Sequence, residues 1–333
     1  MSDPRAESNP FQPGKPLQEP DRFIGREHEL LFIFQQIEKQ QPTSVIGENR
    51  SGKTWLLRYL MNESIRQRYI PGGEAIIFLY ADAASGLHSP EEFIQYILAG
   101  IQEKVPHLKL RARGSLQRQL YDCLDSMSPW RLVLILDDFE SIAGDGGFPL
   151  DFYTFLRLIA TDRDVSFIIT TRQELFRCLP QQVTNSPFAN IFTTMRMGPF
   201  AEDDLEAFIA WGEERSGMPI SQWIQTMDDI TGRFPYLLQL ACHHYFEVWS
   251  EHGGLDQQQE QVALQRYATE AKTYLKIVWE GLSPEAQEII RQTAGGEAVY
   301  ESRESERLEL QGFLRKQRLF SPLFTDFVRT LAK

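Results

Sequence analysis

The sequence has few cysteines, no long apolar run and a deficit of positive charge, and each of these absences excludes a class of protein. Only three cysteines, Cys123, Cys178 and Cys242, occur in 333 residues, and their wide spacing fits neither a metal-binding pattern nor a disulfide framework. No apolar stretch approaches the roughly 18 residues of a membrane span, and the first residues lack the apolar core of a signal peptide. The net charge of −12 argues against general affinity for nucleic acid or anionic membranes. We therefore expect a protein of the reducing cytoplasm with no membrane partner.

One motif stands out against this background. Residues 47–54 read Gly-Glu-Asn-Arg-Ser-Gly-Lys-Thr, the G-x-x-x-x-G-K-[ST] pattern of a phosphate-binding P-loop. Residues 43–46 predict a buried strand before the loop, and residues 53–69 predict a helix after it. This strand and helix disfavour the alternative of a chance match in a glycine-containing turn. The pattern needs Gly47 for a tight turn and Gly52 to let backbone N–H groups close on phosphate oxygens.

The loop supplies most of the predicted nucleotide contacts. Lys53 would reach the β- and γ-phosphates of ATP, or the β-phosphate of ADP, and Thr54 Oγ would bind Mg²⁺. The N-terminus of the following helix would add the positive end of its dipole. The candidate nucleotide-binding residues of the loop are Gly47, Asn49, Arg50, Ser51, Gly52, Lys53, Thr54 and Trp55.

Apolar runs that alternate with helical patterns predict an α/β fold, a parallel P-loop NTPase sheet with helices on both faces. Further strands are expected at residues 75–80, 131–138, 165–172 and 190–198, and helices at residues 27–37, 90–104, 115–127 and 150–161. A basic connector is expected at residues 109–113 and a glycine-rich turn at residues 144–147.

The composition divides the chain into four parts. Residues 1–22, with five prolines among polar residues, predict an extended or disordered lead-in, and residues 23–199 a nucleotide-binding domain. Residues 200–281 predict a helical lid domain, and residues 282–333 a winged-helix-like domain of three short helices and a small hairpin. The expected helices are at residues 201–215, 220–231, 236–251, 257–280, 284–294, 303–316 and 322–331. His243 and His244 lie in an apolar helical run, which favours a packed pair over a metal site.

Two further groups of polar residues follow predicted strands. The carboxyl ends of parallel strands line the ligand crevice of such a sheet. Asp137 is placed to hold Mg²⁺ opposite Thr54, and Asp138 to orient or deprotonate the attacking water, with Glu140 as a competing candidate. A solvated turn is the alternative for this acidic cluster, and the P-loop earlier in the chain argues against it.

Thr170, Thr171 and Arg172 end the next strand. Arg172 would point at the γ-phosphate side of the crevice, because an arginine is always charged and offers a fork of donors. An ordinary arginine at a strand end is the alternative reading of this residue.

In this order and spacing, the motifs resemble the STAND class of AAA+-related P-loop NTPases, relatives of NACHT and NB-ARC switches and of archaeal and bacterial AAA-like ATPases. The resemblance rests on Phe23-Ile-Gly-Arg-Glu, the P-loop, Leu136-Asp-Asp, Thr170-Thr-Arg and Thr231-Gly-Arg-Phe-Pro-Tyr-Leu-Leu-Gln, and extends from residue 9 to residue 251. The segment Phe320-Ser-Pro-Leu-Phe-Thr-Asp-Phe-Val resembles the end of the winged helix in such proteins.

The resemblance implies roles for residues outside the loop. Phe23, Ile24 and Gly25 would lie against adenine, Pro235 would cap the base or ribose from the lid, and Arg172 would sense the γ-phosphate within the same subunit. The winged helix would fold back in the ADP state and swing out with ATP. One departure concerns the histidine of the Met-His-Asp motif with which NB-ARC proteins hold ADP, because no histidine follows His252.

These expectations favour an ATP-binding, slowly hydrolysing switch that forms homo-oligomers in its ATP state. An effector or sensor would act in trans, or the chain would be the core of a longer protein. Arg157 and Arg163 are candidates for an arginine finger that would reach a neighbouring subunit, but the sequence does not distinguish them from ordinary surface arginines. Two alternatives stay open, a DNA-associated AAA+ regulator and a nucleotide-stabilised scaffold that does not hydrolyse ATP. Residues 255–333 carry 11 Lys and Arg against 12 Asp and Glu, which argues against the DNA-binding alternative.

Overall fold

The computed structural model describes residues 9–17, 19–108, 114–144, 148–163, 165–179 and 188–331. The connector expected at residues 109–113 and residues 145–147 of the glycine-rich turn lie outside these ranges. The chain forms two compact units, described separately below. The sheet unit comprises Glu27–Gly47 and Lys53–Arg196, and the helical unit comprises Met1–Arg26, Glu48–Gly52 and Met197–Lys333. Within the described ranges, no helix combines the length and apolar character that a membrane crossing needs.

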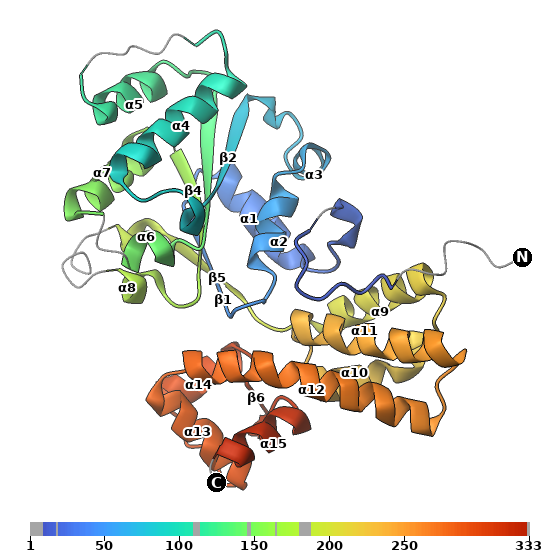
Figure 1. The fold of residues 1–333 in the computed structure, drawn as a ribbon. Helices are drawn as coiled ribbons and strands as arrows, with labels where there is room; N and C mark the ends of the chain where they lie inside the picture. The colour runs from blue at the N-terminus through green and yellow to red at the C-terminus, as the bar shows by residue number, and fades with distance from the viewer. Residues whose placement is uncertain are drawn as a thin grey trace, which may run out of the picture. The chain divides into compact units, whose positions relative to one another are not determined.

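The sheet unit is built on a five-stranded sheet in the order β2-β3-β4-β1-β5 (Figure 1). Its strands are β1 (Thr43–Gly47), β2 (Ile76–Asp82), β3 (Arg131–Asp137), β4 (Val165–Thr171) and β5 (Thr193–Met197). The pairs β2–β3, β3–β4 and β4–β1 are parallel. The predicted α/β class is therefore confirmed, and β4 lies between the strand that leads into the P-loop and the strand that ends at Asp137.

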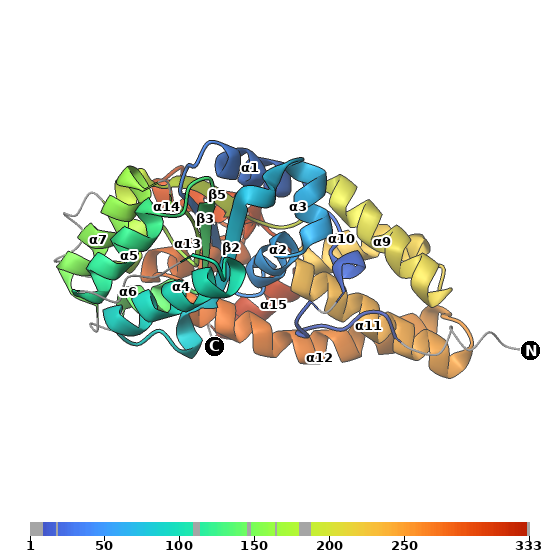
Figure 2. The ribbon, with the colours of Figure 1, turned by 90° about the horizontal axis from the view of Figure 1, so that it is seen from above.

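Helices cover both faces of this sheet, with α4, α5 and α7 on one side and α1 and α2 on the other (Figures 1 and 2). The helices of the sheet unit are α1 (Glu27–Glu38), α2 (Lys53–Leu60), α3 (Glu63–Tyr69), α4 (Pro90–Lys104), α5 (Leu116–Asp125), α6 (Glu140–Gly144), α7 (Leu150–Asp162) and α8 (Leu175–Cys178). Short 3₁₀ helices are η2 (Gly73–Ala75), η3 (Ala83–Ser85) and η4 (Ala189–Ile191).

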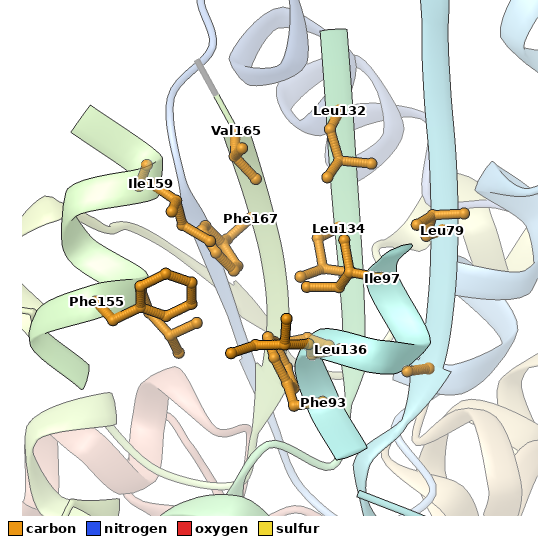
Figure 3. Close-up of a cluster of buried hydrophobic side chains, with 14 of the residues drawn as sticks. Leu79, Phe93, Ile97, Leu132, Leu134, Leu136, Phe155, Ile159, Val165 and Phe167 are labelled. Atoms are coloured by element: carbon orange, nitrogen blue, oxygen red, sulfur yellow. The ribbon is translucent and has the colours of Figure 1, made fainter. Parts of the chain in front are cut away.

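Alternate residues of the strands face the α4–α7 side and form its core. This core includes Leu132, Leu134 and Leu136 of β3 together with Phe93 and Ile97 of α4 (Figure 3). Because strand side chains alternate between the two faces, the remaining apolar residues of the same strands are left for the other side. This two-sided burial explains why β3 and β4 are continuous apolar runs in the sequence.

The helical unit contains residues 200–281 and 282–331, which are called the lid and the winged-helix region below after the domains predicted for them. Its elements are η1 (Pro20–Arg22), α9 (Glu202–Ser216), η5 (Ile220–Trp223), α10 (Ile224–Thr231), α11 (Pro235–His252), α12 (Gln257–Gly281), α13 (Pro284–Gly295), α14 (Arg303–Leu310), β6 (Leu314–Arg315), β7 (Arg318–Leu319) and α15 (Pro322–Leu331). One continuous hydrophobic core joins side chains from α9–α12 with side chains from α13–α15. Phe11 belongs to the same core, where its ring packs against Phe208 and Trp211. The proline-rich segment is thus anchored at this residue.

Two predicted helices are shorter than expected, for local reasons. The helix expected over residues 53–69 is interrupted after Leu60, because the Asn62 side chain accepts hydrogen bonds from Ser64 N and Ser64 Oγ and starts a new helix. The helix expected over residues 303–316 ends at Leu310, because Gly312 has a left-handed φ of 84°. The chain then enters the β6–β7 hairpin.

The three thiols are expected to resist alkylation in the native protein. Burial raises the pKa of Cys123 to about 11 and, together with the nearby Glu140 carboxylate, that of Cys178 to about 12. Burial also raises the pKa of Cys242. The thiolate is the reactive form, and a thiol of pKa 11 is only about one part in a thousand thiolate at pH 8. Iodoacetamide labelling followed by mass spectrometry should therefore be slow until denaturant is added. Rapid labelling of Cys242 in the native protein would contradict the burial of this thiol in the hydrophobic core.

Candidate functional site

The site predicted from the sequence falls into two groups of residues, one in each unit. The sheet unit holds Gly47, Lys53, Thr54, Trp55, Asp137, Asp138 and Arg172; the helical unit holds Phe23, Ile24, Gly25, Asn49, Arg50, Ser51, Gly52 and Pro235. Each group is described within its own unit.

In the sheet unit, Asp137 ends β3 as a buried carboxylate with fixed orientation. Its Oδ1 accepts a hydrogen bond of 2.6 Å from Thr170 Oγ1, and its Oδ2 accepts one of 3.1 Å from the Tyr80 hydroxyl. Burial and the neighbouring Asp137 charge raise the pKa of Tyr80, so the phenol stays a donor. Thr170 reaches Asp137 because β4 is the direct neighbour of β3, and Thr170 is also paired in register with Val45 of β1.

Asp138 directly follows and has an unusual backbone conformation. Its φ is +52°, in the left-handed region that residues other than glycine seldom adopt. Its backbone N–H donates to Thr170 Oγ1 at 2.8 Å, and its Oδ2 accepts from Ser141 Oγ at 3.0 Å. Thr170 therefore positions both acidic residues, a role that its place at a strand end in the sequence did not reveal.

Arg172 and Glu140 are paired with each other. Arg172 Nε donates to Glu140 Oε2 at 3.1 Å, and its backbone N–H also donates to this carboxylate. The Arg172 side chain is 57% exposed, whereas that of Glu140 is 17% exposed. Both residues line a cavity of 360 Å³ together with Ser141, Gln173, Arg177 and Cys178. Arg172, the predicted γ-phosphate sensor, and Glu140, the competing candidate for the base, are therefore paired with each other in this conformation.

The two ends of the P-loop belong to the sheet unit. Gly47 ends β1, and Lys53 begins α2 with its ammonium donating to Gly47 O at 2.6 Å. Thr54 is exposed and Trp55 is half-buried. An exposed hydroxyl at the start of a helix and a buried carboxylate at the end of β3 are hard oxygen ligands of the kind that Mg²⁺ prefers.

The middle of the loop groups with the helical unit and has a strained turn. Arg50 and Gly52 have positive φ values of 61° and 99°, and Ser51 N donates to Glu48 O at 3.1 Å. Among the described residues, the buried Ser51 hydroxyl has no hydrogen-bond partner. A buried polar atom without a partner, in a loop with left-handed residues, fits a site for phosphate oxygens.

Side chains of the helical unit hold the loop from several directions. The Tyr274 hydroxyl of α12 donates to Asn49 O at 3.0 Å, and Gln311 Nε2 donates to Glu48 Oε1 at 2.7 Å. The Arg50 guanidinium lies 4.1 Å from the centre of the Tyr236 ring. These contacts join the loop to the lid and to the winged-helix region, and no local sequence pattern predicts them.

Arg26 is a further residue that the site prediction omitted. It is 3% exposed, and its guanidinium donates to Gly198 O at 2.6 Å and to Ser51 O at 3.4 Å. Its backbone N–H donates to Asp204 Oδ1, and a Cβ on Gly25 would meet that same side chain at 2.7 Å. The available signal was its position inside the Phe-Ile-Gly-Arg-Glu motif.

The remaining residues predicted to contact the nucleotide belong to the helical unit. Phe23 is half-buried, and Ile24 packs on the core of the helical unit. Pro235 begins α11 after Gly232 and Arg233, both with positive φ. A Cβ on Gly232 would approach the Phe320 ring to 2.5 Å, so this turn is packed directly against the winged-helix region.

Comparison with known proteins agrees with this architecture. The chain is similar to the Walker-type ATPase PABY2304 of Pyrococcus abyssi, with a TM-score of 0.65 and 16% identity over 96% of this chain and 99% of that one. It is also similar to the Aeropyrum pernix ORC2 protein, solved as ADPNP and ADP complexes, with a TM-score of 0.59 and 14% identity over 99% and 97% of the two chains. At these identities the likeness concerns the fold. No curated protein matches the chain significantly.

Sequence profiles of protein families identify the group more closely. A profile described as AAA domain matches residues 36–179, which include the P-loop and Asp137. The profile of the Novel STAND NTPase 2 family matches residues 124–296, slightly more than half of the chain, from the end of α5 to the end of α13. These matches confirm the resemblance found in the motifs, and the chain is a P-loop NTPase that belongs to the Novel STAND NTPase 2 family.

Proposed function

We propose that the protein is an ATP-binding, slowly hydrolysing molecular switch that couples its nucleotide state to conformational change and oligomerisation in signalling or defence. The observation that carries this proposal is the set of contacts on the P-loop. Glu48, Asn49 and Ser51 are bound by Gln311, Tyr274 and Arg26. A loop built only for catalysis needs no such connections to a lid and a winged-helix region.

The physical link between phosphate and conformation is the backbone of the loop. Its N–H groups must converge on phosphate oxygens when a nucleotide binds, and the carbonyl groups of the same peptides turn with them. Tyr274 and Gln311 report on these peptides and on the neighbouring Glu48 side chain. A ligand shifts a conformational equilibrium only by its differential affinity for the two states, and these contacts supply such a difference. Gln311 would also take the place of the missing Met-His-Asp histidine as the winged-helix group that senses the loop.

The residues of the sheet unit are assigned the hydrolytic roles. Lys53 would bind the β- and γ-phosphates, and Thr54 and Asp137 would hold Mg²⁺, which would offset the negative charge of the phosphates. Asp138 would orient the attacking water. Arg172 would leave Glu140 to meet the γ-phosphate, and the high exposure of its side chain permits that exchange. Phe23, Ile24, Gly25 and Pro235 would contact the base or ribose.

The decisive experiment measures the mass of the protein in solution with ADP and with a non-hydrolysable ATP analogue. We expect a homo-oligomer with the analogue and a smaller species with ADP. An identical mass in both states would count heavily against an assembling switch. Phosphate release measured on the same sample separates the switch from a scaffold that binds ATP without turnover, because the scaffold would gain stability from ATP and release no phosphate.

Loss of the side-chain contacts on the P-loop should uncouple conformation from nucleotide state without preventing nucleotide binding. In a Tyr274→Phe, Gln311→Ala double variant, we expect ATP to bind while the difference in protease sensitivity between the two nucleotide states shrinks. The phenylalanine keeps the buried ring, so the change removes one hydroxyl and one amide. Tyr300→Phe is the matched control because Tyr300 is 84% exposed. An undiminished difference in the double variant would remove these contacts from the coupling.

A DNA-associated function is the second candidate. The β6–β7 hairpin brings together Arg315, Lys316 and Arg318, although Arg315 is paired with Asp228 at 2.8 Å. A wing with basic residues is a surface that could contact DNA phosphates. A salt-dependent shift of duplex DNA by the purified protein, weakened by Lys316→Ala, would favour this candidate over the signalling switch.

A further inference from the structure

We propose that His243, His244 and Glu247 of α11 form a binding site for one divalent transition-metal ion of the zinc type. Their ligand atoms, one from each residue, all lie within 4.8 Å of one another. Residues three and four apart share one face of a helix, so Glu247 is within reach of both histidines. This site is separate from the nucleotide-binding residues and lies wholly within the helical unit.

The first histidine has its ring orientation set by the N-terminal segment. Asn9 Oδ1 accepts from Phe11 N at 3.0 Å, so its Nδ2 is the amide group that faces the His243 backbone carbonyl at 3.1 Å. The Phe11 carbonyl oxygen lies 2.9 Å from His243 Nδ1 and can only accept. Asn9 Nδ2 lies 2.9 Å from the same nitrogen and can only donate, so the contacts of Nδ1 allow either tautomer. When the proton is on Nδ1 and directed at the Phe11 carbonyl, Nε2 carries a lone pair 3.2 Å from Glu247 Oε1, and this is the form that binds a metal ion.

The second histidine is oriented from the opposite side by α12. His244 Nε2 lies 2.9 Å from Glu270 Oε2, so the ring donates its Nε2 proton to this carboxylate. Its Nδ1 then carries a lone pair, and among the described residues this atom has no hydrogen-bond partner. The nearest carboxylate oxygen, Glu247 Oε2, is 3.6 Å away. His244 is 9% exposed, so bulk water does not compensate fully for the missing partner.

In the tautomer with the His243 proton on Nδ1, three acceptors face one another, because His243 Nε2, His244 Nδ1 and the Glu247 carboxylate all carry lone pairs and none can donate to another. A cation placed among them satisfies all three. Hydrogen bonds from the far ring nitrogen of each histidine to a carbonyl or carboxylate are the usual support of metal-ligating histidines, because they fix the tautomer and raise the basicity of the ligand.

The chemistry of the three ligands selects the class of ion. Two imidazole nitrogens and one carboxylate oxygen suit Zn²⁺, and suit Mg²⁺ or Ca²⁺ poorly because those ions prefer oxygen ligands. The Glu247 side chain is 41% exposed, so it can rotate toward the ion, and water can complete the coordination. The bound ion would tie the residue 9–11 segment and α12 to α11. The interpretation of His243 and His244 as a merely packed pair would then be incomplete.

The test titrates Zn²⁺ alone into untagged full-length protein, with excess Mg²⁺ to occupy the nucleotide-associated metal site. We expect one zinc per chain by calorimetry and a rise in Tm, because the ion binds the folded state. Co²⁺ should give the visible absorption of a site with nitrogen and oxygen ligands. Neither readout depends on ATP hydrolysis.

Glu247→Gln and His244→Ala should each weaken zinc binding by about tenfold or more. Glu270→Gln, which alters only the support of His244, should weaken it less. His252→Ala is the matched control, because this exposed histidine lies on the same helix outside the cluster. Zinc affinity that is equal in the wild type and in Glu247→Gln would overturn the site. If His244→Ala fails to fold, Glu247→Gln still tests the site, because the Glu247 side chain is partly exposed and its replacement should leave the fold intact.

Discussion

A Lys53→Ala variant is expected to lose nucleotide binding. The ammonium group already lies against the loop, 2.6 Å from Gly47 O, and would become the principal positive charge on the β- and γ-phosphates. Two charge-assisted hydrogen bonds lost at about 1.5 kcal/mol each predict a loss of about 3 kcal/mol, roughly a hundredfold in affinity. Fluorescent ATP and ADP titrations measure this directly.

Two controls show whether a loss of affinity in Lys53→Ala comes from the missing ammonium group. Lys39→Ala removes an exposed lysine just after α1 and should leave affinity unchanged. The unfolding midpoint of Lys53→Ala without nucleotide should stay close to that of the wild type, because the side chain is only half-buried, although the variant removes its hydrogen bond to Gly47 O. Unchanged ATP affinity in a folded Lys53→Ala protein would show that residues 47–54 are not the phosphate site.

An Asp138→Asn variant is expected to bind ATP normally and to release phosphate about 10²–10⁴-fold more slowly, the usual contribution of a positioned base. Asparagine keeps the side-chain shape and tolerates the left-handed conformation at this position. It can still accept from Ser141 Oγ, so the surrounding geometry should persist. Single-turnover phosphate release separates this chemical defect from slow product release.

Glu140→Gln decides between the two acidic candidates. Because Glu140 pairs with Arg172, this change should release Arg172 and alter the response to the γ-phosphate more than the chemical step. Asp151→Asn, an exposed position at the start of α7, is the control for charge alone. A larger loss of turnover in Glu140→Gln than in Asp138→Asn would transfer the role of base to Glu140.

Much of the fold followed from patterns that neighbouring residues establish by themselves. The continuous apolar run of β3 required burial on both faces, and Ser89 followed by Pro90 marked the start of α4. The break before α3 was missed, because the capping hydrogen bond of Asn62 outweighs a helical pattern that continues beyond it. The short helices α6 and α8 were missed as well, since segments of five and four residues carry too little periodicity to be recognised.

The candidate site divides in the same way. Its charged groups could be named from the sequence, because a P-loop and an acidic strand end are local patterns with fixed chemistry. The residues that orient them could not, since a threonine such as Thr170 or a tyrosine such as Tyr80 has no distinctive neighbours. Only the strand order brings both onto Asp137.

By itself, the sequence determined that this chain is a P-loop NTPase of the STAND and AAA-like kind, because phosphate binding needs particular residues at fixed spacing along a short segment. The tertiary structure decided which side chains hold that segment. Gln311 is 263 residues from Glu48 and Tyr274 is 225 residues from Asn49, and no local pattern encodes a hydrogen bond across such a separation. The same holds for His243 and His244, whose ring nitrogens are contacted by Phe11 and Glu270. These contacts arise only when a shared hydrophobic core brings distant segments together.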